Sequence, residues 1–220
     1  PRIKDGEIVL DDFSLSDEDL KQINKIMITA CGSAFYAGSV GKYVIEELCR
    51  IPVEADLASE LRYRNPIIDE HTLLVVISQS GETADTIAAL RECKARGAKT
   101  LAIVNVVGST IATESDDVLY TWAGPEISVA STKAYSTQLA VIYLLALYIG
   151  EQLGKFTQEQ LSAYIAALEK LPGTPTAQRI QSVVEEKLLA ADYAKTANAY
   201  INYRTEHEHL REMDDELVKI

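Results

Sequence analysis

The chain has 220 residues and a mass of 24.2 kDa, enough for one domain or for one domain with an accessory segment. Apolar residues make up 47% of it and charged residues 25%, a composition typical of globular proteins and not of disordered chains. Asp and Glu number 33 against 21 Lys and Arg, which gives a net charge of −12. Because so acidic a surface repels phosphate backbones, we expect no nucleic-acid partner, and any anionic ligand must be held by local donors.

The longest strongly apolar run, Leu139–Ile149, is shorter than the ~20 residues that a membrane span needs. No basic segment followed by an apolar one opens the chain, which begins at Pro1. We therefore expect no membrane partner, a cytoplasmic location, and a piece of a longer protein. The three cysteines, Cys31, Cys49 and Cys93, lack C-x-x-C spacing, which favours reduced thiols that fill core space over a metal or redox site.

Short apolar runs alternate with amphipathic segments along the first two thirds of the chain. Five runs have strand length and composition: Lys25–Ala30, Pro52–Leu57, Leu73–Ile77, Lys99–Val104 and Val118–Ala123. The helical segments between and after them are 34–50, 59–64, 83–96 and 131–150. This alternation predicts an α/β fold with a doubly wound, five-stranded parallel sheet and right-handed crossovers.

Helical periodicity also predicts which side chains face the core. The inner face of the first long helix should consist of Ala37, Val40, Gly41, Val44 and Leu48. Gly38 and Gly41 would let this helix approach the sheet closely.

The flanks differ from this central region. Ser16 and Asp19 have the spacing of a capping box before a short surface helix. Beyond Gly154 the strands stop, and a helical face is formed by Leu161, Tyr164, Ile165 and Leu168. A Pro-Gly break at 172–175 precedes a charged, mostly helical segment, Thr176–Ile220. We expect three parts: a linker and helix (1–24), the α/β domain (25–154) and a helical extension (155–220).

The segment Ser78–Thr83 (SQSGET) carries the strongest chemical signal, because it joins a buried strand to the start of a helix. Open α/β sheets bind ligands at the carboxyl ends of their strands, where the strand order reverses. Three hydroxyls, a glycine and the free N–H groups of a helix start together suit a phosphate dianion without a metal. Helix capping alone would explain one of these hydroxyls but not three.

Two other loops should meet this segment. If the strand order is 2-1-3-4-5, Cys31–Ala34 after the first strand faces Ser78–Thr83 across one crevice. A third loop, Val129–Lys133, opens the last long helix of the sheet with two hydroxyls and a lysine. A lysine at a helix N-terminus opposes the helix dipole, so Lys133 either meets an anion or is simply solvated.

Four segments in order resemble the sugar isomerase (SIS) domain family: Ala30–Gly38 (ACGSAFYAG), Ala58–Pro66 (ASELRYRNP), Ser78–Thr86 (SQSGETADT) and Glu126–Leu139 (EISVASTKAYSTQL). The resemblance covers roughly residues 2–172 and implies a flavodoxin-like three-layer sandwich with flanking helices. It is nearest to modules of hexosamine-forming, glutamine-dependent aminotransferases. It therefore implies a sugar-phosphate ligand, fructose 6-phosphate or glucosamine 6-phosphate, no cofactor, and pairing of modules through helices into a homodimer.

The resemblance also assigns binding residues. Phosphate contacts would come from Ser78, Gln79, Ser80 and Thr83. The sugar end would contact Ser131 and the backbone of Val129 and Ala130. In the loop after the first strand, Ser33 and Ala34 stand where one common form of the family has Thr-Ser, so contacts there would use Ser33 or the backbone.

No catalytic residue is carried over. In the family, the glutaminase nucleophile, the isomerase base, the Schiff-base lysine and the ring-opening histidine belong to segments that this chain does not match. We expect the chain alone to bind and not to turn over substrate. Three alternatives stay open: a sugar-phosphate-sensing module of a regulator, a stand-alone phosphosugar isomerase, and an FMN protein, since S-x-S-G-x-T resembles a flavin phosphate loop.

Four further features favour structural roles. His207 and His209 are two residues apart and do not share a helix face, which argues against a metal site. His71 should be a loop residue before the third strand. The segment Arg62–Arg64 either ends a surface helix, binds an anion or bridges a subunit interface. Glu82, inside the hydroxyl-rich segment, either points away or acts as a helix-start carboxylate.

Overall fold

A computed structural model of the chain describes residues 3–4, 7–10, 13–126 and 131–170. The chain divides into two compact units, Pro1–Pro172 and Gly173–Ile220, and the second lies outside the described residues. The predicted helical segment Thr176–Ile220, with His207 and His209, therefore also lies outside the described residues. Within the described part, no helix combines the length and apolarity needed to cross a membrane.

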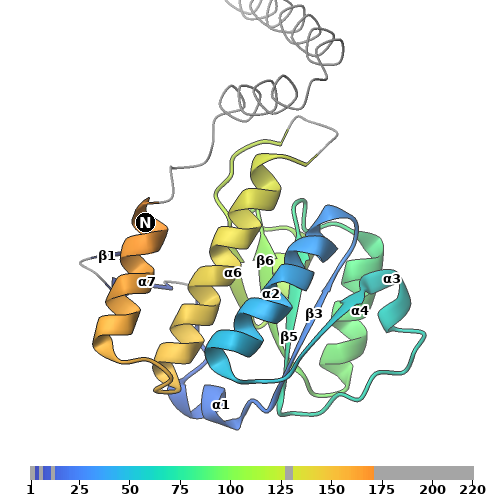
Figure 1. Ribbon diagram of the computed structural model, residues 1–220. Helices are drawn as coiled ribbons and strands as arrows, with labels where there is room; N and C mark the ends of the chain where they lie inside the picture. The colour runs from blue at the N-terminus through green and yellow to red at the C-terminus, as the bar shows by residue number, and fades with distance from the viewer. Residues whose placement is uncertain (1–2, 5–6, 11–12, 127–130, 171–220) are drawn as a thin grey trace, which may run out of the picture. The chain divides into compact units, whose positions relative to one another are not determined.

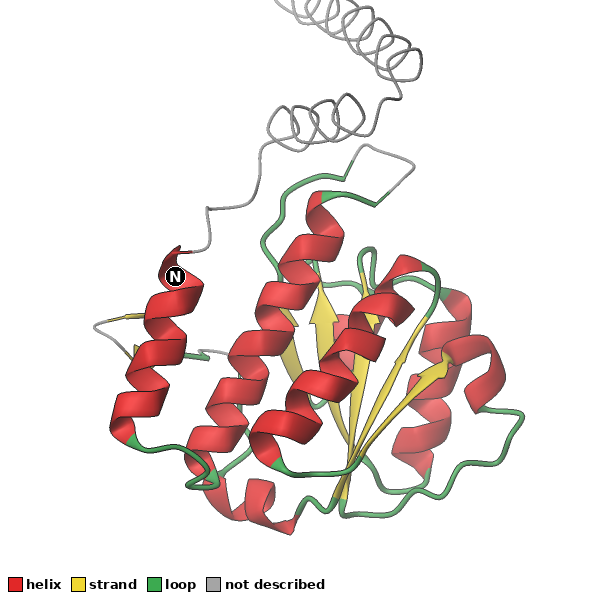
Figure 2. Ribbon diagram, viewed as in Figure 1, coloured by secondary structure: helices red, strands yellow, loops and turns green. Residues whose placement is uncertain are grey.

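The sheet has five parallel strands, as predicted, and their order β4–β3–β5–β6–β7 is the 2-1-3-4-5 order on which the predicted crevice depends. Figure 2 shows these strands in yellow. The strands are β3 (Lys25–Ala30), β4 (Val53–Leu57), β5 (Thr72–Ser78), β6 (Lys99–Val104) and β7 (Asp117–Tyr120). Every residue of β5 is buried, which is why its sequence is an uninterrupted apolar run.

Helices cover both faces of this sheet and make three layers. On one face lie α2 (Ser33–Cys49) and α6 (Lys133–Gln152), and on the other α3 (Ala58–Leu61), α4 (Ala84–Ala95) and α5 (Thr110–Glu114), as Figure 1 shows for four of them. Each face of the sheet carries its own hydrophobic core, and successive residues of β5 point into one and then the other. Leu73, Val75 and Ile77 pack under α2 and α6, whereas Leu74 and Val76 pack under α4.

Close approach of α2 to its neighbours depends on its two internal glycines. A Cβ on Gly38 would lie 2.7 Å from Cγ2 of Ile28 in β3. A Cβ on Gly41 would lie 2.9 Å from Cγ2 of Ile142 in α6. The prediction that these glycines allow close packing is confirmed, and one of them serves the contact with α6 and not only the sheet.

The inner face predicted for α2 is partly wrong. Ala37 and Gly41 are buried as expected, but the other buried positions include Ile45 and Cys49. Val40, Val44 and Leu48 are only half-buried. The face is rotated because α2 packs against α6 as well as against the sheet, so its buried stripe is set by two neighbours.

Element ends differ from the predictions by a few residues. The last strand stops at Tyr120, three residues earlier than expected, and Trp122 has a left-handed backbone with φ 52°. The short helix α5 was not predicted, because five residues carry too little periodicity. Two-residue strands β1 (Ile3–Lys4) and β2 (Glu7–Ile8) pair near the N-terminus and were also missed. Helix α4 ends as predicted before Gly97, whose φ is 96°.

The flanking helices pack on the α2/α6 face. The predicted capping box of α1 (Asp17–Gln22) is confirmed: Ser16 Oγ accepts from the Asp19 N–H at 3.1 Å, and the Asp19 carboxylate accepts from the Ser16 N–H at 3.1 Å. In α7 (Gln158–Lys170), Leu161 and Ile165 are buried in the α2/α6 core. The first unit therefore includes α7 as a packed part of its core.

Candidate functional site

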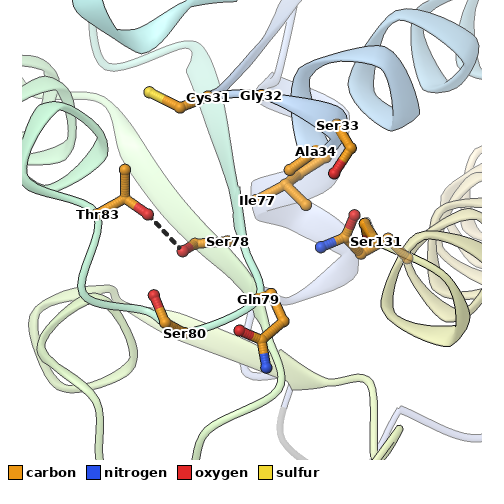
Figure 3. Close-up of a pocket in the computed structure, with 11 residues that line it drawn as sticks. Cys31, Gly32, Ser33, Ala34, Ile77, Ser78, Gln79, Ser80, Thr83 and Ser131 are labelled. Carbon is orange, nitrogen blue, oxygen red and sulfur yellow. Dashed lines mark hydrogen bonds between the residues drawn. The ribbon is translucent and has the colours of Figure 1, made fainter. Parts of the chain in front are cut away.

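A cavity of about 320 Å³ lies at the carboxyl ends of the neighbouring strands β3 and β5. Figure 3 shows its lining residues. They come from the loop after β3, the loop after β5 and the segment that leads into α6: Cys31, Gly32, Ser33, Ala34, Ile77, Ser78, Gln79, Ser80, Thr83, Ser131 and Gln138. The cavity exists because β3 and β5 are neighbours while their following helices, α2 and α4, lie on opposite faces of the sheet.

The predicted site residues with described positions all line this one cavity. Ser78, Ser80 and Thr83 lie on one side of it, and Ser33, Ala34 and Ser131 lie on the other (Figure 3). Gln79 also lines it. The predicted backbone contacts at Val129 and Ala130 lie outside the described residues. The loop Cys31–Ala34 lines the cavity as predicted, whereas Ile77 and Gln138, the latter one turn into α6, were not predicted as lining residues.

Hydrogen bonds of side-chain hydroxyl groups stabilise the conformation of the loop that follows β5. Ser78 Oγ accepts from the Gly81 N–H at 3.0 Å and lies 3.1 Å from Thr83 Oγ1, while Ser80 Oγ accepts from the Glu82 N–H at 3.2 Å. Because each hydroxyl also has a proton, the Ser80 hydroxyl and one of the Ser78–Thr83 pair keep an O–H to donate. No side chain caps the N-terminus of α4, so its first-turn N–H groups add further donors.

Gly81 is required for this loop on two counts. Its φ is +67°, a left-handed conformation that side chains disfavour. A Cβ at this position would also lie 2.0 Å from Oγ and 2.5 Å from Cβ of Ser109. The loop therefore packs directly against the residue that precedes α5.

Glu82 does not face the cavity as an anion ligand but caps another helix. Its carboxylate accepts from the Thr110 N–H and from Thr110 Oγ1, both at 2.7 Å, at the N-terminus of α5. The backbone N–H and hydroxyl of Thr110 hold the pKa of Glu82 below its ordinary value. The expected helix-start role is confirmed, on α5 instead of α4.

A second carboxylate holds the segment that leads into α6. The Glu126 side chain accepts from the N–H groups of Thr132 and Ala134, at 3.2 and 3.1 Å, and from Thr132 Oγ1. These bonds join the two ends of the segment that contains residues 127–130. They fix Ser131, which lines the cavity, at the start of α6. The sequence analysis did not identify this role of Glu126.

None of the described lining residues carries a charge. Three helix N-termini contribute to the cavity instead: Gly32–Ala34 at α2, Thr83 at α4 and Ser131 before α6. Neither α2 nor α4 has a side-chain cap, whereas α6 is capped by Glu126. The positive ends of α2 and α4 are thus available to an anion.

The lesser candidates lie elsewhere. Arg64 forms ion pairs with Glu54 and Asp56 on the surface, so the segment Arg62–Arg64 has a structural role in the described part of the chain. His71 is in the loop before β5, and its carbonyl accepts from the Asn24 N–H. Lys133 is the first residue of α6 and is not among the lining residues.

The cysteines are free thiols. Cys49 and Cys93 are buried, as expected, and burial raises the pKa of each thiol to about 12. Cys31 is half-buried and lines the cavity. No group of three potential metal ligands occurs among the described residues.

Comparison with known protein families adds a direct assignment. The family model described as "SIS domain" matches residues 19–148, more than half of the chain. The chain belongs to the SIS domain family. The matched range contains the whole sheet and every described residue that lines the cavity. A second family model, described as "ATP cone domain", matches residues 149–209, of which 171–209 lie outside the described residues.

Curated relatives are similar over most of the chain. A glutamine–fructose-6-phosphate aminotransferase (isomerizing) from Clostridium tetani is 59% identical over 166 residues, 76% of this chain and 27% of its own length. The enzyme of the same name from Caldanaerobacter subterraneus is 54% identical over 192 residues, 87% of this chain and 31% of its own length. The chain thus spans about a third or less of these relatives.

Solved structures give the same result for the SIS fold. The C-terminal domain of glucosamine-fructose-6-phosphate aminotransferase from Francisella tularensis has a TM-score of 0.73 and 37% identity, covering 85% of this chain and 50% of that one. A glucosamine-6-phosphate deaminase from Thermotoga maritima has a TM-score of 0.56 and 25% identity, covering 68% of this chain and 46% of that one.

Replacing Gly81 by alanine should destabilise the fold by about 3 kcal/mol, because it combines a left-handed φ with a clash against Ser109. The matched control is Gly154→Ala, which has a similar φ of +64° and open space around its Cβ, and should lose only about 1 kcal/mol. Urea unfolding measures both. Adding Ser109→Gly to Gly81→Ala should recover most of the difference; equal losses in the two single variants would disprove the packing argument.

Glu82→Gln tests the cap of α5 through pH. Since the folded-state pKa of Glu82 is lowered, its contribution to stability is present above the unfolded carboxyl pKa and is lost as the pH falls through the folded value. The melting temperature of the native chain should exceed that of Glu82→Gln at pH 7 and converge with it towards pH 3. Equal melting temperatures of the two proteins at pH 7 would contradict this role of Glu82.

Proposed function

We propose that this SIS module binds a sugar phosphate, fructose 6-phosphate or glucosamine 6-phosphate, as part of the isomerase half of a glutamine–fructose-6-phosphate aminotransferase. The observation that carries the proposal is the uncharged, donor-rich cavity at the carboxyl ends of β3 and β5. In this assignment the chain binds the sugar-phosphate substrate of an enzyme of hexosamine synthesis. The identity of 59% and 54% to enzymes of that name supports the choice of this substrate class.

The dianion would occupy the side of the cavity formed by the loop after β5. The Ser80 hydroxyl, one hydroxyl of the Ser78–Thr83 pair and the first-turn N–H groups of α4 can donate, as phosphate oxygens require. Helix dipoles add to this without a cation. A neutral site also suits a chain of net charge −12, because it binds one small anion locally without relying on the overall field.

Of the alternatives, the FMN protein is the least supported. A flavodoxin-type phosphate loop usually follows the first strand of the sheet, whereas Ser78–Thr83 follows β5, the third. A regulator module and a stand-alone isomerase would both use the same cavity and differ in what accompanies it. Absence of flavin absorbance in the purified protein would count against FMN binding.

Isothermal titration calorimetry tests the proposal with fructose 6-phosphate as the ligand and unphosphorylated fructose as the control. We expect fructose 6-phosphate to bind and fructose not to. Ser80→Ala should weaken binding about tenfold or more, because it removes a hydrogen bond to a charged group. The matched variant Ser115→Ala, whose hydroxyl donates to the Ile111 carbonyl outside the cavity, should bind as the native chain does. A folded native chain that binds neither sugar would contradict the proposal.

We also propose that two copies of the module associate through α2. Tyr36 and Tyr43 lie seven residues apart on this helix and are 66% and 71% exposed. Two large aromatic side chains on one helix face are typical of an interface. Light scattering should give twice the 24.2 kDa protomer mass at micromolar concentration, and Tyr43→Glu should halve it. A single protomer mass for the native chain would contradict the pairing.

Nucleotide binding is a second candidate, for residues 149–209 alone. The match to the "ATP cone domain" model is the observation that supports it. In the described part of that range, Leu161 and Ile165 of α7 are packed in the SIS core. Titration of the native chain with ATP in the presence of saturating fructose 6-phosphate, which would occupy the cavity, tests this candidate separately. No heat of binding from ATP would contradict this candidate and leave the sugar-phosphate proposal intact.

A further inference from the structure

Gln138 is a buried polar residue with no evident role in the fold. It lies one turn into α6, its side chain is only 2% exposed, and it lines the cavity. Its amide oxygen, Oε1, has no hydrogen-bond partner among the described residues. The neighbouring inward positions of the same helix are apolar, including Val141, Ile142 and Leu145.

An unpaired amide oxygen in such a place is unfavourable for the folded chain. Buried side-chain polar atoms nearly always have a partner, and leaving one without a partner destabilises a protein. A methionine would fill the same volume without that penalty. The position of Gln138 at the cavity wall indicates that the missing partner is a ligand group.

The chemistry of the ligand group follows from the polarity of the contact. An amide oxygen only accepts hydrogen bonds, and a phosphate dianion has no proton to donate. The partner must therefore be a hydroxyl or an ammonium group. The phosphate side of the cavity offers donors from Ser80 and from one of the Ser78–Thr83 pair, so it needs acceptors from the ligand. The two requirements are met by one molecule with a phosphate at one end and hydroxyl groups at the other.

The surroundings of Gln138 suit the uncharged, hydroxyl-bearing end of such a ligand. The N-terminus of α6 is already capped by the Glu126 carboxylate, which offsets the positive end of the helix dipole there. Ser131, which lies next to that cap, contributes a neutral hydroxyl to the same wall of the cavity. An anion is therefore favoured at the α4 side and a polyol at the α6 side.

We propose that Gln138 is a specificity-determining residue, whose amide oxygen accepts a hydrogen bond from a hydroxyl of the sugar part of the ligand. The inference rests on the proposed function of this cavity. It explains how a site with no charged side chain among its described lining residues distinguishes a sugar phosphate from inorganic phosphate: Gln138 is satisfied only by the former.

The test compares fructose 6-phosphate with inorganic phosphate as ligands. Gln138→Met, which keeps the side-chain volume, should weaken fructose 6-phosphate binding about tenfold and change phosphate binding less than twofold. Gln138→Glu keeps an acceptor but adds a charge that repels the phosphate of both ligands. It should weaken both by a similar factor and preserve their ratio. Gln152→Met, on the same helix but outside the cavity lining, should bind both ligands as the native chain does.

The melting temperature of the unliganded variants separates this role from a structural one. Gln138→Met should melt at the native temperature or above it, because it removes an unsatisfied buried acceptor. A fall of several degrees, or an equal loss of affinity for both ligands, would overturn the inference and leave the phosphate loop in place. Failure of the native chain to bind either ligand would overturn the proposed function, and this inference with it.

Discussion

The parallel pairing of β3 with β5 is the constraint on which the site depends. Residues Lys25–Ala30 are in register with Thr72–Ile77, so the loops that follow the two strands emerge side by side. The register also brings Ala30 level with Ile77, one residue before Ser78. Because α2 and α4 then diverge to opposite faces, the space between their N-termini stays open as a cavity.

Carboxylates support this cavity without entering it. Glu82 and Glu126 both lie within segments that border the cavity, and each accepts hydrogen bonds from the N-terminus of a helix. Acidic residues therefore fix the loops while the described cavity wall stays neutral. This arrangement makes the proposed anionic ligand compatible with a chain of net charge −12.

The sequence predicted the five parallel strands and most of the cavity, since both follow from local patterns. Buried strands are continuous apolar runs, and Ser78–Thr83 is a dense cluster of hydroxyls after one of them. What it did not predict depends on contacts between distant segments. The rotation of α2 is set by Ile142 on α6, the partner of Glu82 is a helix 28 residues away, and Gln138 resembles an ordinary helical residue until its burial is known.

The central claim is that neutral donors at the carboxyl edge of β5 hold a phosphate group. A ¹H–¹⁵N correlation spectrum of the labelled chain, recorded with and without fructose 6-phosphate, tests it most directly. We expect the largest shifts at the amides of Ser80, Thr83 and Ala84, with little change at the far edge of the sheet near β7. Shifts concentrated away from the loop after β5, or their absence at saturating ligand, would contradict the account.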